Sequence, residues 1–181
     1  MSIEFKDQRE AQDSINKDVE IIDELGNETK DHQEDLEGLY EKLEYLMDCE
    51  GLYSGSDTRL VENVEMAIEA RETDIEECKE KIEETKEEIE YKVDYLQEGI
   101  SKTEERCGQM KDLVSNLNYS QEGVINNINI EIINQEAEIQ DANEKKDGLE
   151  QIIRLAEGII VGGAAAEVIG DYLGQITSVF G

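Results

Sequence analysis

The sequence of 181 residues has no proline and no tryptophan, and it contains only two phenylalanines and one histidine. Because proline is the commonest helix breaker, its absence permits long uninterrupted helices. Large aromatic side chains are scarce, hydrophobic residues make up 38% of the chain, and charged residues make up 35%. This composition argues against a large compact core. These features favour long helices over a β-sandwich or an α/β fold, arranged as one domain or one extended assembly.

Cationic residues are also few: 17 lysines and arginines stand against 47 aspartates and glutamates, a formal net charge of −30. Phosphate binding needs clustered lysine and arginine, so the composition argues against a nucleic-acid partner. It argues equally against binding to an anionic membrane surface. A strongly acidic chain suits a basic protein partner, and it also suits simple solubility, so both interpretations stay open.

The three cysteines, Cys49, Cys78 and Cys107, are widely spaced and form no C-x-x-C pair. The sequence therefore predicts no zinc site, no redox motif and no cofactor, and Cys49 and Cys78 are expected to be core thiols. The first residues, "MSIEFKDQREAQ", lack the basic and apolar regions of a signal peptide. We expect synthesis in the cytoplasm, and any secretion would use a route without a cleaved signal.

A heptad pattern of apolar residues runs from Ile15 to Leu46 and predicts an amphipathic helix of coiled-coil type. One series, seven residues apart, holds Ile15, Ile22, Thr29, Leu36 and Leu43, and the other holds Leu25, His32, Leu39 and Leu46. The next stretch, "DCEGLYSGSD", contains two glycines and candidate N-caps, so it predicts a turn near 48–56.

A second helix follows at once, with a longer heptad series: Val61, Ile68, Ile75, Ile82, Ile89, Leu96, Thr103, Met110 and Leu117. Its companion series is poorer and ends at Lys92, after which the stripe moves one residue along to Val93, Ile100, Cys107 and Val114. This shift predicts that the helix presents a different face beyond about residue 95. A turn near 117–122 and a third helix with apolar residues at 3–4 spacing complete the pattern.

We therefore predict an all-α fold, an elongated antiparallel helical hairpin or coiled-coil bundle of three or four long helices. Residues 1–120 form the long hairpin, and residues 121–181 form a third helix that continues into a glycine-rich C-terminal helix. Folding about residue 52 places His32 opposite Arg71. Thr29, His32 and Arg71 are then expected to form a polar core layer that fixes helix register.

The single histidine limits the chemistry of this chain. One histidine cannot supply the two Glu-x-x-His pairs of a four-helix di-iron site. A Ser-His-Asp triad would have to use His32 in the middle of a helix, without a strand-turn-helix elbow. The sequence therefore predicts no catalytic residues and no metal ligands, and we expect a protein that is not an enzyme.

Tyr53-Ser54-Gly55 places an aromatic residue one position ahead of a glycine, between two helices of heptad character. With the apolar residues Leu60, Val61 and Val64, it resembles the hairpin turn of the WXG and LXG proteins of type VII secretion, over about residues 1–100. Tyrosine replaces the family's tryptophan, and the chain is nearly twice as long as the smallest members. The length of the chain is closer to the length of LXG-type effector N-terminal domains, or of their helical targeting partners. A plain helical hairpin turn remains the alternative.

The last part of the chain carries a small residue at every fourth position: Gly158, Gly162, Ala166, Gly170, Gly174 and Ser178. Such stripes let two helix backbones approach closely. Glu167 and Asp171 interrupt the segment, and two central acids would cost about 5–7 kcal/mol on insertion. We expect a helix-packing stripe against another helix, with any membrane contact confined to residues 158–180. Similar glycine-zipper segments follow the helical domain of some LXG toxins.

These observations predict a non-enzymatic helical interaction protein, a type VII secretion substrate of LXG type or its targeting partner. The expected partner is another helical protein or a second copy of the chain. Two alternatives stay open: a conditional pore-forming protein that uses the glycine zipper, and an acidic scaffold of phage type.

Overall fold

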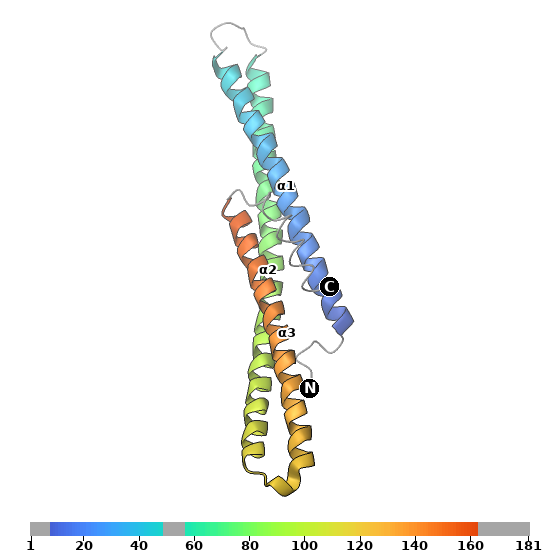
Figure 1. Ribbon diagram of the computed structural model, residues 1–181. Coiled ribbons are helices and arrows are strands. Elements are labelled where there is room, and N and C mark those ends of the chain that lie inside the picture. Colours follow the sequence, from blue (N-terminus) through green and yellow to red (C-terminus); the bar gives the residue numbers. More distant parts are fainter. Residues whose placement is uncertain (1–7, 49–56, 163–181) are drawn as a thin grey trace. The chain divides into compact units, whose positions relative to one another are not determined.

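The structure is a computed structural model that describes residues 8–48 and 57–162 (Figure 1). It contains the helices α1 (Gln8–Asp48), α2 (Asp57–Ser115) and α3 (Glu122–Ile160), with a short 3₁₀-helix η1 (Tyr119–Gln121) between the last two. No strand occurs in these described ranges. The predicted all-α fold is therefore confirmed, and the turn predicted near 117–122 coincides with η1.

The heptad positions of α2 explain why this helix of 59 residues is stable. Six successive members of its main series are buried: Ile68, Ile75, Ile82, Ile89, Leu96 and Thr103. The companion stripe is buried at Cys78, Thr85 and Lys92, and then at Ile100 and Cys107, one residue out of step. The predicted change of face near residue 95 is therefore present in the structure. A continuous helix has to shift its buried stripe where the elements packed against it change.

The helices divide into two compact units, and each unit is described by itself. In the described ranges, unit 1 comprises residues 8–19 and 86–154, and unit 2 comprises residues 20–48, 57–85 and 155–162.

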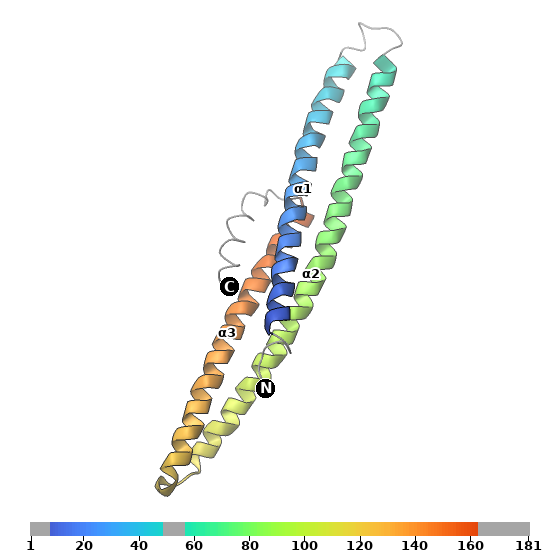
Figure 2. The ribbon, with the colours of Figure 1, turned by 90° about the vertical axis from the view of Figure 1, so that its right-hand side faces the viewer.

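In unit 1, the second half of α2 and most of α3 run antiparallel (Figure 2). Lys111 Nζ donates to Glu136 Oε1 at 2.6 Å, and Lys146 Nζ donates to Gln97 Oε1 at 2.8 Å. The residue numbers on α3 rise as the numbers of their partners on α2 fall, so the two helices run in opposite directions. Leu149 and Ile152 of α3 are fully buried and form part of the core.

The first turns of α1 also belong to unit 1 and carry a buried charge. Lys92 of α2 pairs with Asp18 and donates a second hydrogen bond to Ser14 Oγ at 2.9 Å. Both charged side chains are almost withdrawn from water, with exposed fractions of 11% for Lys92 and 6% for Asp18. Long charged side chains are rarely buried without a partner, so this pair ties α1 to α2 at one register.

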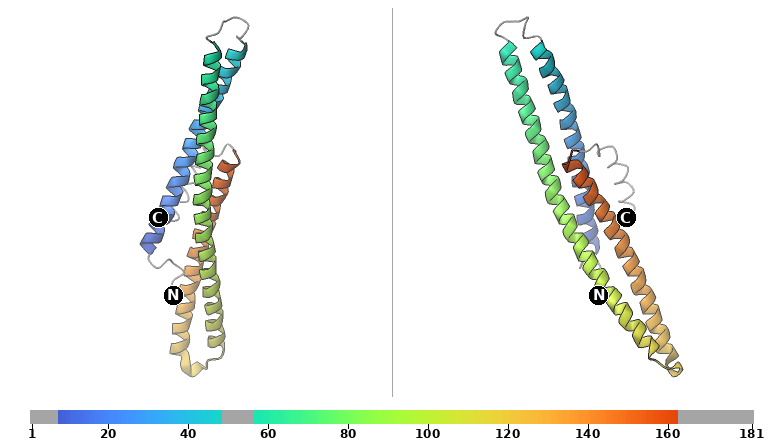
Figure 3. Two further views of the ribbon diagram at one scale, coloured as in Figure 1. Left: turned by 180° about the vertical axis from the view of Figure 1, so that it is seen from behind. Right: turned by 90° about the vertical axis from the view of Figure 1, so that its left-hand side faces the viewer.

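In unit 2, the remaining part of α1 and the first half of α2 run antiparallel, as Figure 3 shows. Contacts pair Glu28 with Cys78 and Asp35 with Arg71. The end of α3 contributes Ala156, fully buried, and Ile159, 4% exposed. The predicted turn near 48–56 falls almost wholly outside the described residues, since α1 ends at Asp48 and α2 begins at Asp57.

The predicted continuation of α3 into the glycine stripe falls mostly on residues 163–181, which lie outside the described residues. The helix ends at Ile160, and Gly162 has a φ of +84°, the left-handed conformation that favours glycine. Its amide donates to Ile159 O at 3.0 Å, as in a glycine C-cap. Gly158 therefore lies within α3, whereas Gly162 lies in its cap, so the two do not form one continuous helical stripe.

Candidate protein-interaction site

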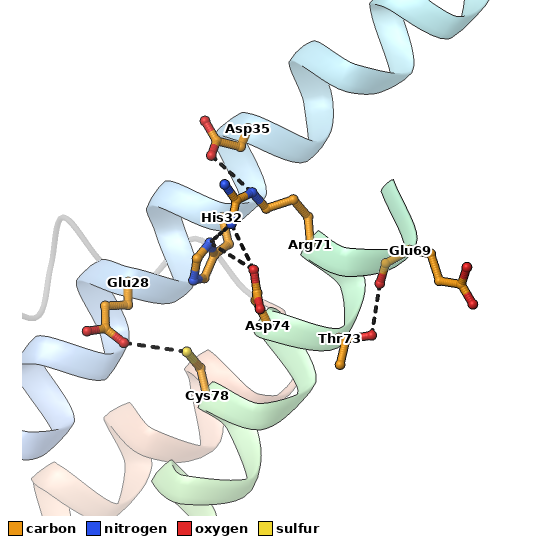
Figure 4. A network of polar contacts seen from close by, with 8 residues as sticks. All are labelled: Glu28, His32, Asp35, Glu69, Arg71, Thr73, Asp74 and Cys78. Carbon is orange, nitrogen blue, oxygen red and sulfur yellow. Dashed lines mark hydrogen bonds and ion pairs between the residues drawn. The ribbon is translucent and has the colours of Figure 1, made fainter. Parts of the chain in front are cut away.

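A cluster of polar side chains joins α1 to α2 in the middle of unit 2 (Figure 4). Arg71 is its centre: Nε lies 3.2 Å from Asp35 Oδ2, and Nη1 lies 2.8 Å from Asp74 Oδ2. Arg71 Nη1 also lies 3.5 Å from His32 Nδ1, which is 4.0 Å from Asp74 Oδ2. Because a guanidinium only donates, its bond to the imidazole requires His32 Nδ1 to accept.

The three residues predicted to form one polar core layer take two different positions. The structure brings His32 and Arg71 together, with side chains 24% and 38% exposed, at the edge of the helix pair. Thr29 is buried at 2% exposure and donates to Leu25 O of its own helix at 2.7 Å. Threonine can satisfy its hydroxyl within one helix, so it does not need the histidine and the arginine.

Cys78 lies one helical turn beyond Asp74 on α2. Its Sγ atom is 3.8 Å from Glu28 Oε2. Burial raises the pKa of the Cys78 thiol above its ordinary value. Burial raises the pKa of Cys107 in the same way. Both thiols are buried and free, as expected for Cys78, while Cys49 lies outside the described residues.

The end of unit 2 beyond this cluster, residues 33–48 of α1 and 57–71 of α2, is called here the hairpin end. Its α1 leucines continue the heptad pattern but are only half-buried: Leu36, Leu39, Leu43 and Leu46. Further large apolar side chains are exposed, namely Tyr40, Tyr45, Met47, Leu60 and Met66. Two helices alone cannot cover both flanks of an apolar seam, so the hairpin end retains an uncovered apolar surface.

A hollow of about 290 Å³ opens on this surface, lined by Asp35, Gly38, Leu39, Ala67 and Arg71. It exists because Gly38 has no side chain and Ala67 has only a methyl group. A Cβ atom built on Gly38 would meet nothing within 4 Å. The hollow is therefore an apolar depression bordered by the ion pair of Arg71 and Asp35, and we name it the Gly38 hollow.

Tyr40 is an exposed aromatic residue of the hairpin end whose hydroxyl is held by a hydrogen bond. Its hydroxyl donates to Glu72 Oε1 at 2.8 Å, and this hydrogen bond raises the pKa of the Tyr40 hydroxyl. The ring remains 47% exposed although its hydroxyl is held. A tyrosine with an anchored polar end and an open apolar face is typical of interaction surfaces.

Sequence reasoning missed two features that the structure shows. The heptad spacing puts Lys92 at the end of the poorer companion series, and this spacing alone does not show that its ammonium pairs with Asp18. The Gly38 hollow was missed because Gly38 lies outside both heptad series, although a glycine beside an apolar seam was a signal. The remaining predicted site residues lie outside the described residues: Tyr53, Gly55, Ala166, Gly170, Gly174 and Ser178.

Among the described helices, none is long and apolar enough to cross a membrane. In the same part of the chain, no group of three or more histidine, cysteine or acidic side chains is arranged to hold a metal ion. Comparison with protein-family models, with curated proteins and with solved structures found no match to this chain.

Proposed function

We propose that this chain is a non-enzymatic helical interaction protein whose hairpin end binds a protein partner. The observation that carries the proposal is the uncovered apolar surface of the hairpin end, where heptad leucines stay half-buried beside exposed tyrosines and methionines. Aromatic and methionine side chains are enriched in protein interfaces. Exposed apolar patches on water-soluble helices commonly mark such sites.

The chemistry around the hollow supports binding over catalysis. Gly38, Leu39 and Ala67 supply neither a nucleophile nor a proton-transfer group. Asp35 and Asp74 are engaged by Arg71, which also contacts the only histidine of the chain. The polar groups beside the hollow are thus used to hold α1 on α2.

Within this class, we propose a type VII secretion substrate similar to LXG effector N-terminal domains, or the targeting partner of such a substrate. The support is the resemblance at Tyr53 and Gly55, together with two long helices, α1 and α2, on either side. This function requires that the two flanking helices run antiparallel. It also requires that their hairpin end in a protein-binding surface.

Co-expression with any small helical-hairpin protein that a neighbouring gene is found to encode tests the proposal. We expect such a protein to co-elute with the full chain in size-exclusion chromatography, and we expect export to require the secretion ATPase. Tyr45→Glu should weaken the complex at least about tenfold, because Tyr45 is 70% exposed at the hairpin end. Tyr91→Glu is the matched control, since Tyr91 is 72% exposed in unit 1. Absence of any complex, or equal effects of both variants, would contradict the proposal.

A further inference from the structure

The hairpin end combines its apolar surface with a strong negative charge. In the described residues 33–48 and 57–71, ten carboxylates stand against three lysines and arginines, a formal charge of −7. Asp35 is paired with Arg71. The glutamates between residues 33 and 48 of α1 are exposed and form no ion pair within the described ranges: Glu34, Glu37, Glu41 and Glu44.

This combination restricts what can cover the surface. A second copy would bring another charge of −7 against the first, and like charges facing each other disfavour association. A partner with cationic side chains would instead find unpaired carboxylates beside an apolar seam. The seam follows two antiparallel helices, so the matching element is a third helix laid along them.

The Gly38 hollow supplies the place where such a helix would anchor. Gly38 lets a neighbouring backbone or a large side chain approach α1, and Leu39 and Ala67 provide apolar contacts. Interfaces gain most from a few large side chains seated in such depressions. We infer that the Gly38 hollow receives apolar side chains from a basic amphipathic helix of a partner protein. This inference rests on the proposed function, because it assumes that the hairpin end binds a protein.

The test uses the full chain and three fluorescent peptides of about 18 residues, roughly 27 Å as helices. The first has a heptad leucine stripe with lysine elsewhere, the second has glutamate in place of lysine, and the third has the lysine peptide's composition in scrambled order. We expect the first to bind at least about tenfold more tightly than the other two, and binding to weaken as salt rises.

Gly38→Leu is the decisive variant. Its side chain would extend into open space within the fold, so the thermal midpoint should not fall, yet it would fill the hollow. Affinity for the lysine peptide should drop at least about tenfold. Gly108→Leu is the matched control, because a Cβ on Gly108 also meets nothing within 4 Å and Gly108 lies in unit 1. Its affinity should stay within about twofold of the unaltered chain.

Three results would overturn the inference. Equal binding by the unaltered chain and Gly38→Leu would place the peptide elsewhere. A dimer in sedimentation velocity that Gly38→Leu abolishes would assign the hollow to a second copy. Peptide binding that is absent in the full chain and is seen only after removal of residues 163–181 would assign the hollow to the chain's own C-terminal segment. Each of these three results is compatible with the complex that we expect with a helical-hairpin protein. Failure of this inference can therefore be distinguished from failure of the proposed function.

Discussion

Lys92 and Asp18 form the least exposed ion pair of the described residues. The attraction between two buried charges roughly offsets the cost of removing them from water, whereas a single unpaired buried charge is strongly destabilising. The pair therefore contributes less to net stability than to the choice of register between α1 and α2. Removal of one partner of the pair and replacement of both partners by apolar residues should therefore change the stability of the fold by very different amounts.

Lys92→Met should destabilise the fold by about 3–5 kcal/mol, because it leaves Asp18 buried without a cation. The double variant Lys92→Met with Asp18→Leu should recover most of that loss. Urea unfolding followed by circular dichroism measures both. Lys102→Met is the control, since Lys102 pairs with Glu98 on the exposed face of α2, and no measurable change is expected. Equal losses in the single and double variants would show that the pair is not energetically coupled.

The buried thiols give a prediction that depends on pH. Burial raises the pKa of Cys78 and Cys107, so the folded state favours the neutral thiol. The resulting stability is fully present below the thiol pKa of the unfolded chain, about 8.5, and is lost as pH rises through the higher folded value. In a Cys49→Ser variant, both thiols should react far more slowly with a disulfide reagent at pH 8 than after denaturation, and the thermal midpoint should fall above about pH 9. Unchanged reactivity on denaturation would contradict this prediction.

At the scale of elements, the two glycines Gly162 and Gly108 show opposite uses of the same residue. Gly162 adopts a φ of +84° at the end of α3, whereas Gly108 lies inside α2. An L-residue is strained by about 1–2 kcal/mol in the left-handed conformation, while a glycine inside a helix costs about 0.5–1 kcal/mol relative to alanine.

Gly162→Ala should therefore destabilise the end of α3 by about 1 kcal/mol, and Gly108→Ala should stabilise α2 by about 0.5–1 kcal/mol. Hydrogen exchange of the Ile159 and Ile160 amides should accelerate in the first variant and stay unchanged in the second. If Gly162→Ala instead protects those amides, the helix continues past residue 160, and the predicted continuous stripe is restored.

The helices were predictable because a seven-residue spacing of apolar residues leaves few alternatives in a chain without proline. The main series of α2 and its change of face near residue 95 are both visible in the sequence. The end of α3 was not predictable from spacing, because glycine is compatible with both a packed helix stripe and a helix cap. The Gly38 hollow depends on which flank of a helix pair stays uncovered, and a heptad pattern defines only the flank that is buried.

At the scale of the whole molecule, the net charge of −30 acts on every folded region at once. Mutual repulsion of carboxylates opposes compact states, and salt shortens its range, from about 30 Å at 0.01 M to about 8 Å at 0.15 M. The thermal midpoint should therefore rise with sodium chloride over this range. Differential scanning calorimetry measures it, and a midpoint that falls with salt would mean that favourable ion pairs outweigh the repulsion.

The buried pair of Asp18 and Lys92 also has a consequence for the order of events during synthesis. The two residues are 74 positions apart, so at 5–20 residues per second the ribosome makes Lys92 roughly 4–15 s after Asp18. Throughout that interval the carboxylate stays hydrated and the first turns of α1 have no buried position to occupy. We expect the contiguous α1–α2 contacts of unit 2 to form first, and the start of the chain to be captured only once the second half of α2 has left the ribosome.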